Sequence, residues 1–382
     1  MGNLITPQSI RPTATRSALS VGKKAVPLTP SPEQNPGDVV ELNPIGVEKN
    51  ESTKISPDTQ AKLGATAAAA ATSGPAGLTT AYCSTYSIVA RCPETGRLGV
   101  AVESHWFDVR NTVAWVQPGV GAVATQAATN QAFGPRGLAL MKAGKSPNEA
   151  LAVMETEDPV FARRQVGMVD TQGRVSGHTG ELCVGHASSF AGEGYVAQSN
   201  LMENEGVPEA MGKAFESTEG PLEKRLMAAL EAAEKKGGDI RGGQSAALVV
   251  MEGTSSGDPL KDRVVDLTVP DHPHPVAELG RLLKLHEDYS GYGELLEAAK
   301  NGETQKVKGM VDNLSPEAAE LRFWSALELF NAGEKKDACK VLDDLFARKP
   351  GFRAVLPRLV PAQIIPEGAD REILGATSGA DV

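Results

Sequence analysis

Several features are scarce or missing in this chain, and each absence excludes a class of protein. Its 382 residues include only four cysteines, with no C-x-x-C spacing, so we expect neither a zinc site nor a disulfide framework. No apolar run is long enough to span a membrane. Acidic residues outnumber basic ones, 48 against 38, which argues against nucleic acid as a partner.

The chain also lacks sequence signals for a metal or for export. The histidine pair in Asp271-His272-Pro273-His274-Pro275 is interrupted by prolines ahead of an expected helix, which favours a domain junction over zinc binding. We therefore expect no metal and no cofactor. The Ala-rich stretch 63–71 is too weakly hydrophobic, and too far along the chain, for an ordinary secretory signal. Localisation is open, with the cytoplasm as the default.

Composition and periodicity divide the chain into four parts. Residues 1–82 are rich in Pro, Ser, Thr, Asn and Ala without a sustained period, which predicts a disordered arm or propeptide. Residues 83–286 mix β-prone runs with amphipathic helices, and residues 287–361 are wholly helical. Residues 362–382 form a tail. The expected fold class is α+β, with helices covering stacked antiparallel sheets.

Residues 83–286 are expected to contain both strands and helices. Two hairpins are expected, one around Pro93-Glu94-Thr95-Gly96 and one around Thr171-Gln172-Gly173. Ser146, Pro147 and Glu149 predict a capped helix start. The remaining strands are expected at 112–116, 120–125, 195–199, 245–251 and 264–269, and the helices near 135–143, 147–156, 206–217, 221–236 and 275–286.

The helical part contains one tetratricopeptide-style helix pair of about 34 residues. Its pattern is Leu321, Trp324, Leu327 and Phe330, followed by Gly333, Ala338, Val341, Leu342, Leu345 and Pro350. A single such unit cannot bury its own apolar face, so it must pack on the main domain or on another chain. This is compatible with a homo-oligomer. The pair is either a binding groove or a structural cap.

Thr85 opens the first strand of the folded part, at the junction with the arm. A threonine freed at that point carries its own general base, because an α-amine has a pKa of roughly 7.7 to 8.0. This is the chemistry of N-terminal nucleophile (Ntn) enzymes, in which the side-chain oxygen attacks an amide carbonyl. Two alternatives stay open: Thr85 simply begins a strand, or Cys83 is the nucleophile.

The first hairpin predicts what lies beside Thr85. If Glu94-Thr95 is the loop, Thr85 pairs with Ser104 to within about one residue. Glu103, Ser104 and His105 would then flank the nucleophile. An acid, a hydroxyl and an imidazole are groups that can orient an amine, relay a proton or bind substrate. The alternative is a hairpin end with ordinary polar residues.

Polar residues also end several other strands, which indicates a shared site. Asn200 carries an amide that can donate to an oxyanion, and Arg241 lies in a glycine-rich loop suited to holding a carboxylate. The remaining candidates for substrate binding are Thr125, Gln126, His178, Thr179, Asp239, Gln244 and Ser245. Taken singly, each is explained by loop chemistry or capping.

At this point the residues resemble a known family, the uncharacterised bacterial Ntn-hydrolase-like proteins labelled as a domain of unknown function. The matching stretches run in order through residues 85–286 and are TYSIVARCPETGRLGVAVESHWF, PGVGAVATQAATNQAFGPRGL, RQVGMVDTQGRVSGHTGE, QSNLM, GGDIRGGQSAALVV and DLTVPDHPHPVAEL. Residues 288–361, ending in FRAVLPRLVP, resemble a helical module that is often fused to such proteins and labelled as peptidoglycan-binding.

The resemblance implies a four-layer αββα sandwich with the nucleophile at the start of a central strand. In many relatives the matching threonine stands close behind the initiator Met or a signal peptide, whereas 84 residues precede Thr85 here. Cleavage at Ser84-Thr85, by a protease or by the chain itself, is therefore required. The leading hypothesis is an amidohydrolase acting on a small amide or peptide-like substrate. The alternative is a non-catalytic protein that binds peptidoglycan fragments or a protein partner.

Overall fold

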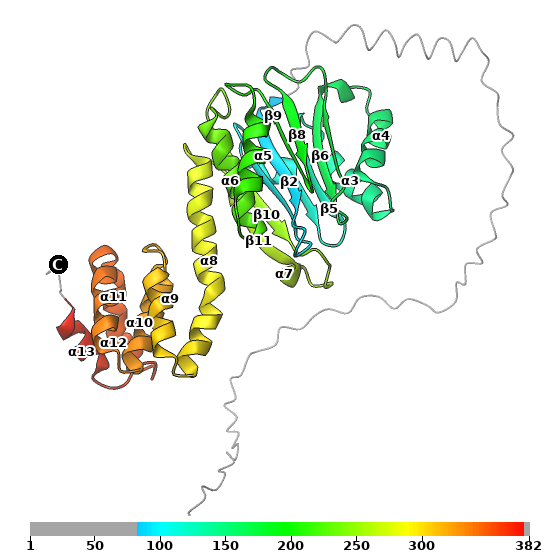
Figure 1. Cartoon of the computed structure of the whole chain (residues 1–382). Helices are drawn as coiled ribbons and strands as arrows, with labels where there is room; N and C mark the ends of the chain where they lie inside the picture. Colours follow the sequence, from blue (N-terminus) through cyan, green and yellow to red (C-terminus); the bar gives the residue numbers. More distant parts are fainter. Residues whose placement is uncertain (1–81, 378–382) are drawn as a thin grey trace, which may run out of the picture. The chain divides into compact units, whose positions relative to one another are not determined.

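The computed structural model describes residues 82–377, so the expected arm lies outside the described residues apart from its last position. Two antiparallel sheets face each other, and helices pack on their outer faces (Figure 1). A C-terminal group of helices follows. The expected α+β class, with antiparallel sheets and C-terminal helices, is confirmed.

The six-stranded sheet carries Thr85 in one of its two middle strands. Its spatial order is β11, β10, β3, β2, β9, β8. Turn residues after β2, between two largely apolar strands that are buried on both faces, make the β2–β3 hairpin, in which Thr85 pairs with Ser104 as predicted. The strands are β2 Thr85–Arg91, β3 Leu98–Ser104, β8 Ser188–Gly192, β9 Tyr195–Asn200, β10 Ser245–Met251 and β11 Arg263–Val269.

The five-stranded sheet is built around β5. It runs β1, β5, β6, β7, and β4 also pairs with β5. The second predicted hairpin is present as β6–β7. The expected strand at 112–116 is in part the short helix α2, and the strand itself begins at Ala114. The strands are β1 Tyr82–Cys83, β4 Ala114–Gln117, β5 Gly121–Ala128, β6 Arg164–Asp170 and β7 Val175–Thr179.

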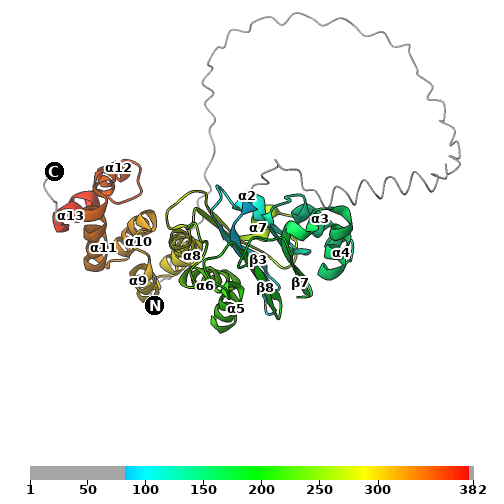
Figure 2. The same ribbon diagram turned by 90° about the horizontal axis from the view of Figure 1, so that it is seen from above.

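Helices cover both outer faces, as Figure 2 shows from a second direction. Apolar side chains of α5 and α6 pack on the six-stranded sheet, and those of α3 and α4 on the five-stranded sheet. The predicted capping box at Ser146 and Glu149 is present. The helices up to this point are α2 Arg110–Val113, α3 Phe133–Lys142, α4 Pro147–Glu157, η1 Phe161–Arg163, α5 Val207–Ser217, α6 Leu222–Lys235 and α7 Pro259–Asp262.

Helix α8 spans Pro275–Lys300 and joins the sheets to the C-terminal helices. Val276, Leu279 and Leu283 belong to the core over the six-stranded sheet, whereas Leu295 and Ala298 belong to the core of the helical part. The expected boundary at 286 therefore falls inside one continuous helix. The later helices are α9 Thr304–Asn313, α10 Ala319–Asn331, α11 Lys335–Arg348, η2 Pro350–Val355, α12 Leu356–Leu359 and α13 Ala369–Ala376.

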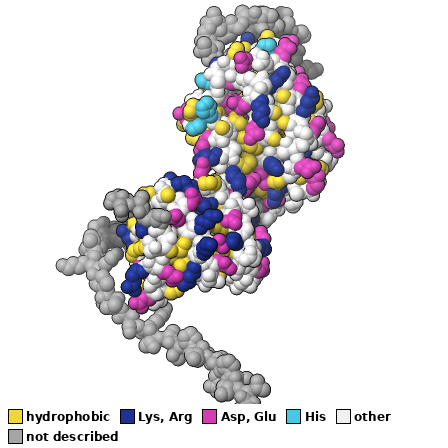
Figure 3. Space-filling view, turned by 60° about the vertical axis from the view of Figure 1, so that its left-hand side comes forward, with side chains coloured by type: hydrophobic (Ala, Val, Ile, Leu, Met, Phe, Trp, Pro, Cys, Tyr) yellow, Lys and Arg dark blue, Asp and Glu magenta, His cyan; other side chains and the backbone are white. Residues whose placement is uncertain are grey.

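The C-terminal helices have their own apolar core. Helices α10 and α11 both contribute to this core, and Ile373 of α13 is fully buried in it, so part of the expected tail is a packed helix. None of the helices among residues 82–377 is both long and apolar enough to cross a membrane. On the face in Figure 3, acidic and basic side chains are interspersed.

Candidate functional site

Four polar residues line up across the six-stranded sheet at the end where β2 begins. Ser245, Ser104, Thr85 and Asn200 are successive cross-strand partners in β10, β3, β2 and β9. Partners in one row of an antiparallel sheet point to the same face. Four residues further along β2, Val89 lies in the apolar core between the sheets, so this polar row, which we call the Thr85 row, faces the opposing sheet.

A chain of hydroxyl groups joins Thr85 to the peptide bond that precedes it. Ser104 Oγ donates to the carbonyl oxygen of Ser84 at 2.5 Å, and Thr85 Oγ1 lies 3.0 Å from Ser104 Oγ. A serine has one hydroxyl hydrogen, and that of Ser104 goes to Ser84. Thr85 is therefore the donor to Ser104. The candidate nucleophile and the neighbouring carbonyl oxygen are linked through one bridging hydroxyl.

The segment before Thr85 crosses from one sheet to the other. Tyr82 and Cys83 pair with the end of β5 in the five-stranded sheet, whereas Thr85 begins a strand of the six-stranded sheet. Ser84 Oγ lies 3.1 Å from the carbonyl oxygen of Asn200 and 3.2 Å from that of Leu201, and its one hydrogen is shared between them. Ser84 and Thr85 both have 0% exposed surface, so the bond between them is buried.

Buried amide side chains of the opposing sheet face the Thr85 row. Gln126 Nε2 donates to the carbonyl oxygen of Thr85 at 3.1 Å, and Gln126 Oε1 accepts from Ser87 Oγ at 2.6 Å. Gln165 Oε1 accepts from Gln126 at 2.8 Å and from Asn200 Nδ2 at 3.0 Å. Polar groups buried in this way stabilise one arrangement of the two sheets only when they are hydrogen-bonded.

The orientation of these amides follows from the backbone carbonyls around Gln165. Its Nε2 lies 2.9 Å from the carbonyl oxygen of Ser199 and 3.2 Å from that of Ser188, and carbonyls only accept. Gln165 Oε1 must therefore face Asn200, which turns the Asn200 amide nitrogen toward it. Asn200 Oδ1 is left buried without a hydrogen-bond donor among the described residues. An unpaired acceptor thus lies in the same row as Thr85.

Glu103 does not join the Thr85 row, although it is adjacent to Ser104 in sequence. Consecutive strand residues point to opposite faces, so Glu103 lies on the helix-covered side, opposite Tyr86. Burial, followed by the carboxylates of Asp239 and Glu234, raises the pKa of Glu103 well above its usual range. A Cβ on Gly243 would lie 2.7 Å from Glu103 Oε1, so only glycine lets the loop pass there.

Replacing Glu103 with Gln should flatten the pH dependence of stability. An unfolded glutamate titrates near roughly pH 4.3, and the folded chain holds the pKa of Glu103 higher. Between those two pKa values the folded state binds the extra proton. Wild type therefore loses stability as the pH rises through this window, by at most about 1.4 kcal/mol per pH unit.

Urea unfolding at a series of pH values from 4 upward measures this effect. The free energy of unfolding of Glu103→Gln minus that of wild type should increase from the acid end to the alkaline end. Wild type loses stability as the pH rises, whereas glutamine has no proton to lose. The exposed Glu155, replaced by Gln, is the matched control and should follow the wild-type profile. Parallel profiles for wild type and Glu103→Gln would contradict the shift.

The predicted loop residues mostly interact with one another. Arg241 pairs with the buried Asp239, at 3.1 Å between Nη2 and Oδ2, so its charge is balanced within the chain. The backbone N–H of His105 donates to Asp239 at 3.3 Å, and His105 Nδ1 lies 2.7 Å from the carbonyl oxygen of Gly242. Gln244 donates to Asp271. These contacts fix the loop beside the row.

The candidates on the five-stranded sheet divide between its two faces. Thr179 faces the other sheet and lies 2.9 Å from Gln165 Nε2. His178 points the other way, where its ring stacks on Phe161 with centroids 4.0 Å apart. Thr125 also faces the helices and donates to the carbonyl oxygen of Asn130. The structure therefore brings Thr85, Ser104, Asn200, Ser245, Gln126 and Thr179 together, and leaves Thr125 and His178 outside.

Sequence reasoning named Ser84 only as the residue before the cleavage site and did not identify Gln165, although both connect the other residues. A glutamine at the start of a strand gives no signal by itself that it is buried. Among residues 82–377, no group of three or more acidic, histidine or cysteine side chains is arranged to hold a metal ion.

Comparison with known proteins gives a family-level similarity. A family model described as a family of unknown function (DUF1028) matches residues 85–279, about half of the chain, and the match begins at Thr85. Protein SPO2555 from Silicibacter pomeroyi, whose crystal structure is described with the same family, is 30% identical. The alignment covers 53% of this chain and 88% of that protein, with a TM-score of 0.48.

A more distant structural similarity is to Anbu, an ancestral beta-subunit from Yersinia bercovieri. It is 11% identical, with 56% of this chain and 95% of that chain covered and a TM-score of 0.27. No curated protein matches this chain.

Proposed function

Because the chain belongs to the DUF1028 family, whose function is unknown, we propose a function from the site itself. The protein is an Ntn-type amidohydrolase that cleaves an amide bond in a small or peptide-like substrate. Thr85 is its nucleophile and forms an acyl-enzyme. No metal or cofactor takes part in the proposed chemistry. The observation that carries the proposal is the hydroxyl chain from Thr85 through Ser104 to the carbonyl oxygen of Ser84.

The same hydroxyl chain supports release of Thr85 by the chain itself. Thr85 Oγ1 attacks the carbonyl carbon of Ser84, and its proton passes through Ser104 to the carbonyl oxygen. The carbonyl re-forms as that proton moves to the leaving nitrogen and the C–N bond breaks. This gives an ester between Ser84 and Thr85 Oγ1 and a free amine. Water then hydrolyses the ester to the Ser84 carboxylate and the Thr85 hydroxyl.

Burial of the bond favours this intramolecular route over an external protease. Ser84 and Thr85 have no exposed surface, whereas proteases cut exposed loop tips. The nucleophile, in contrast, is already adjacent to the carbonyl it would attack. Such fixed proximity replaces a bimolecular encounter with a unimolecular step.

In the cleaved protein, the proposed roles follow from the hydrogen-bonding capacity of each group. The Thr85 α-amine is the general base, since its ordinary pKa lies near neutrality. Asn200 Oδ1, which is buried without a donor among residues 82–377, accepts from this amine and orients it. The second N–H of Asn200, together with backbone N–H groups, donates to the oxyanion. Glu103 and Arg241 act only through the loop and sheet that they stabilise.

The arrangement of layers also supports the proposal. Helices, two facing antiparallel sheets and further helices fit the four-layer Ntn-hydrolase-like sandwich, with the nucleophile starting a central strand. The family match, which begins at residue 85, agrees with a functional unit that starts there. Fold alone does not determine activity, so the proposal depends on the row and its hydroxyl chain.

Intact mass and amino-terminal sequencing of the purified full-length chain test the proposal. We expect a mature chain that starts at Thr85 and hydrolyses members of an amide library. A chain that retains residue 84 after prolonged incubation, and that hydrolyses no amide, would overturn it.

The helical part supports a second function, attachment to peptidoglycan fragments or a protein partner through a tetratricopeptide-like module. Helices α9 to α13 share an apolar core that is separate from the cores over the sheets, so this part can carry its own binding surface. A pull-down on purified peptidoglycan that compares the full-length chain with a chain lacking residues 304–377 measures this binding. Deletion should start after α8, because that helix also packs on the six-stranded sheet. Equal retention of both chains would contradict this role.

A further inference from the structure

A pocket lies at the opposite strand ends from the Thr85 row. Its lining includes Met251, the last residue of β10, whereas Ser245 of the Thr85 row is the first. Six residues of extended strand separate the two by roughly 20 Å. The pocket measures about 700 Å³, which is in the range of small-molecule sites. We call it the Lys142 pocket.

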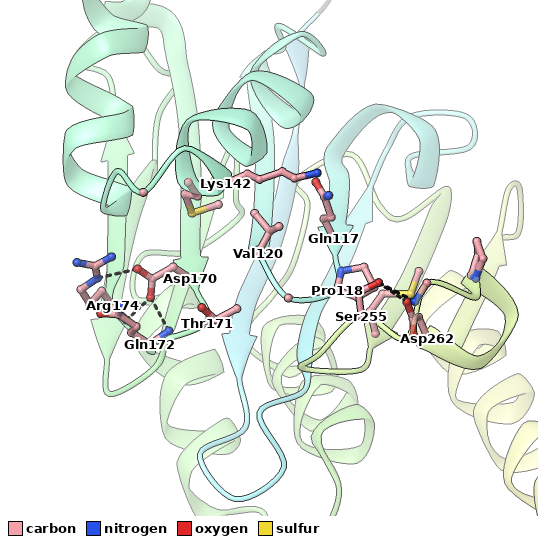
Figure 4. Close-up of a pocket in the computed structure, with 16 residues that line it drawn as sticks. Gln117, Pro118, Val120, Lys142, Asp170, Thr171, Gln172, Arg174, Ser255 and Asp262 are labelled. Carbon is pink, nitrogen blue, oxygen red and sulfur yellow. Dashed lines mark hydrogen bonds and ion pairs between the residues drawn. The ribbon is translucent and has the colours of Figure 1, made fainter.

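The acidic side chains of the Lys142 pocket are occupied by groups of the chain itself. Asp170 accepts from the backbone N–H groups of Gln172 and Arg174, at 2.9 and 3.0 Å, and from Arg174 Nε at 2.7 Å (Figure 4). Asp262 accepts from Ser255 Oγ and from the backbone N–H of Ser256, each at 2.8 Å. Both carboxylates therefore serve to fix the turns that form the walls.

Lys142, in contrast, has no acidic partner among residues 82–377. It is the last residue of α3, and its side chain extends across the pocket above Val120 toward Gln117 (Figure 4). Its ammonium group is thus a positive charge directed over the cavity, and no carboxylate of the described residues pairs with it. A strongly hydrated cation of this kind binds an anion as a point charge.

The pocket has an apolar patch beneath Lys142. Val120 and Met141 are both less than one-tenth exposed and line the cavity. A Cβ on Gly121 would lie 2.7 Å from Met141 Cε, so the glycine allows the methionine to lie against the sheet at this point. Methionine is unbranched and adapts to irregular shapes. A cation above an apolar floor matches a ligand with one anionic end and an apolar body.

We propose that the Lys142 pocket binds a small organic carboxylate. The carboxylate pairs with the Lys142 ammonium, and the apolar body lies on Val120 and Met141. This site is independent of the proposed hydrolase function, because no residue of the Thr85 row lines it.

Hexanoate is a suitable probe, with hexylamine, hexanol and inorganic phosphate as comparisons. Methyl-labelled methionine gives a local NMR signal, because Met141 and Met251 line the pocket while Met202 and Met211 lie in a different core. Hexanoate should produce saturable shifts at Met141 and Met251 in the full-length chain, and leave Met202 and Met211 unchanged. Hexylamine should produce none, and hexanol and phosphate should bind several-fold more weakly.

Two lysine variants separate the pocket from general surface charge. Lys142→Gln should weaken hexanoate binding about two- to fivefold, the loss expected for one exposed charged contact. Lys145→Gln is the matched control, since Lys145 is exposed in the turn that follows α3 but does not line the pocket, and it should bind as wild type. Thr85→Ala should also bind as wild type. Unchanged binding by Lys142→Gln, or equal shifts with hexylamine or phosphate, would overturn the proposal.

Discussion

Thr85→Ala is expected to leave the full-length chain uncut after Ser84 and to abolish amide hydrolysis. The substitution removes the only oxygen that the proposed mechanism uses as a nucleophile, so no partial activity should persist through that route. The side chain is small and lies at the start of a strand, so the variant should fold. Intact mass after expression reports the cleavage, and a thermal unfolding curve reports the fold.

Ser87→Ala is the matched control for this variant. Ser87 lies two residues further along the same strand, on the same face, and is equally buried, but its hydroxyl donates to Gln126 rather than to Ser104. It should be cut and active. Cleavage of Thr85→Ala at the same bond and at the wild-type rate would contradict the mechanism. It would indicate that Cys83 or a protease cuts the bond instead.

Ser104→Ala is expected to slow the cleavage without preventing the chain from folding. The variant loses both the acceptor for the Thr85 proton and the donor to the Ser84 carbonyl oxygen. Loss of one oxyanion donor in an active site costs about 100- to 1,000-fold in rate. Mass spectrometry during a cell-free synthesis reaction measures the fraction of chain that starts at Thr85. Its time course gives the cleavage rates of wild type and of Ser104→Ala.

Ser245→Ala supplies the comparison, because Ser245 belongs to the same row but its hydroxyl donates to the carbonyl oxygen of Trp106. It should be cut at close to the wild-type rate. If Ser104→Ala matured as fast as Ser245→Ala, the bridging hydroxyl would have no part in the reaction.

The pairing of Thr85 with Ser104 was predictable because it is a local property. A short turn fixes the register of a hairpin, and the β-prone runs on either side leave little freedom for slippage. Asn200 was identified only as a polar residue at a strand end. That it pairs with Thr85 depends on β9 lying next to β2, a contact between distant parts of the chain.

The candidate residues outside the Thr85 row are there because their side chains point to the other face of the sheet. Side chains alternate along a strand, so Glu103 and Ser104 cannot both face Thr85. The same alternation separates Thr125 from Gln126, and His178 from Thr179. Sequence alone left the inward face undecided at these strand ends, because both neighbours are polar and apolar alternation gives no guide there.

The hydrogen bonds of the buried amides and the length of α8 could not be predicted from the sequence, because both depend on tertiary packing. Gln165 satisfies groups from both sheets, which only the stacking of those sheets brings together. Helix α8 continues past 286 through Gly291 and Gly293, residues that weaken a helix in isolation. Apolar contacts of its later turns with the C-terminal helices offset that cost.

The crossing of the chain between the sheets at Ser84 makes the proposed cleavage a one-way step. Until the cut strand leaves, the new carboxylate and amine would remain side by side at a high effective concentration, and the bond could re-form. Among the described residues, β1 is held by two residue pairs, Tyr82 with Ala128 and Cys83 with Ala127. Two backbone pairs offset little of the entropy gained when the cut strand leaves. Dissociation would thus separate the reactants for good and expose the row to substrate.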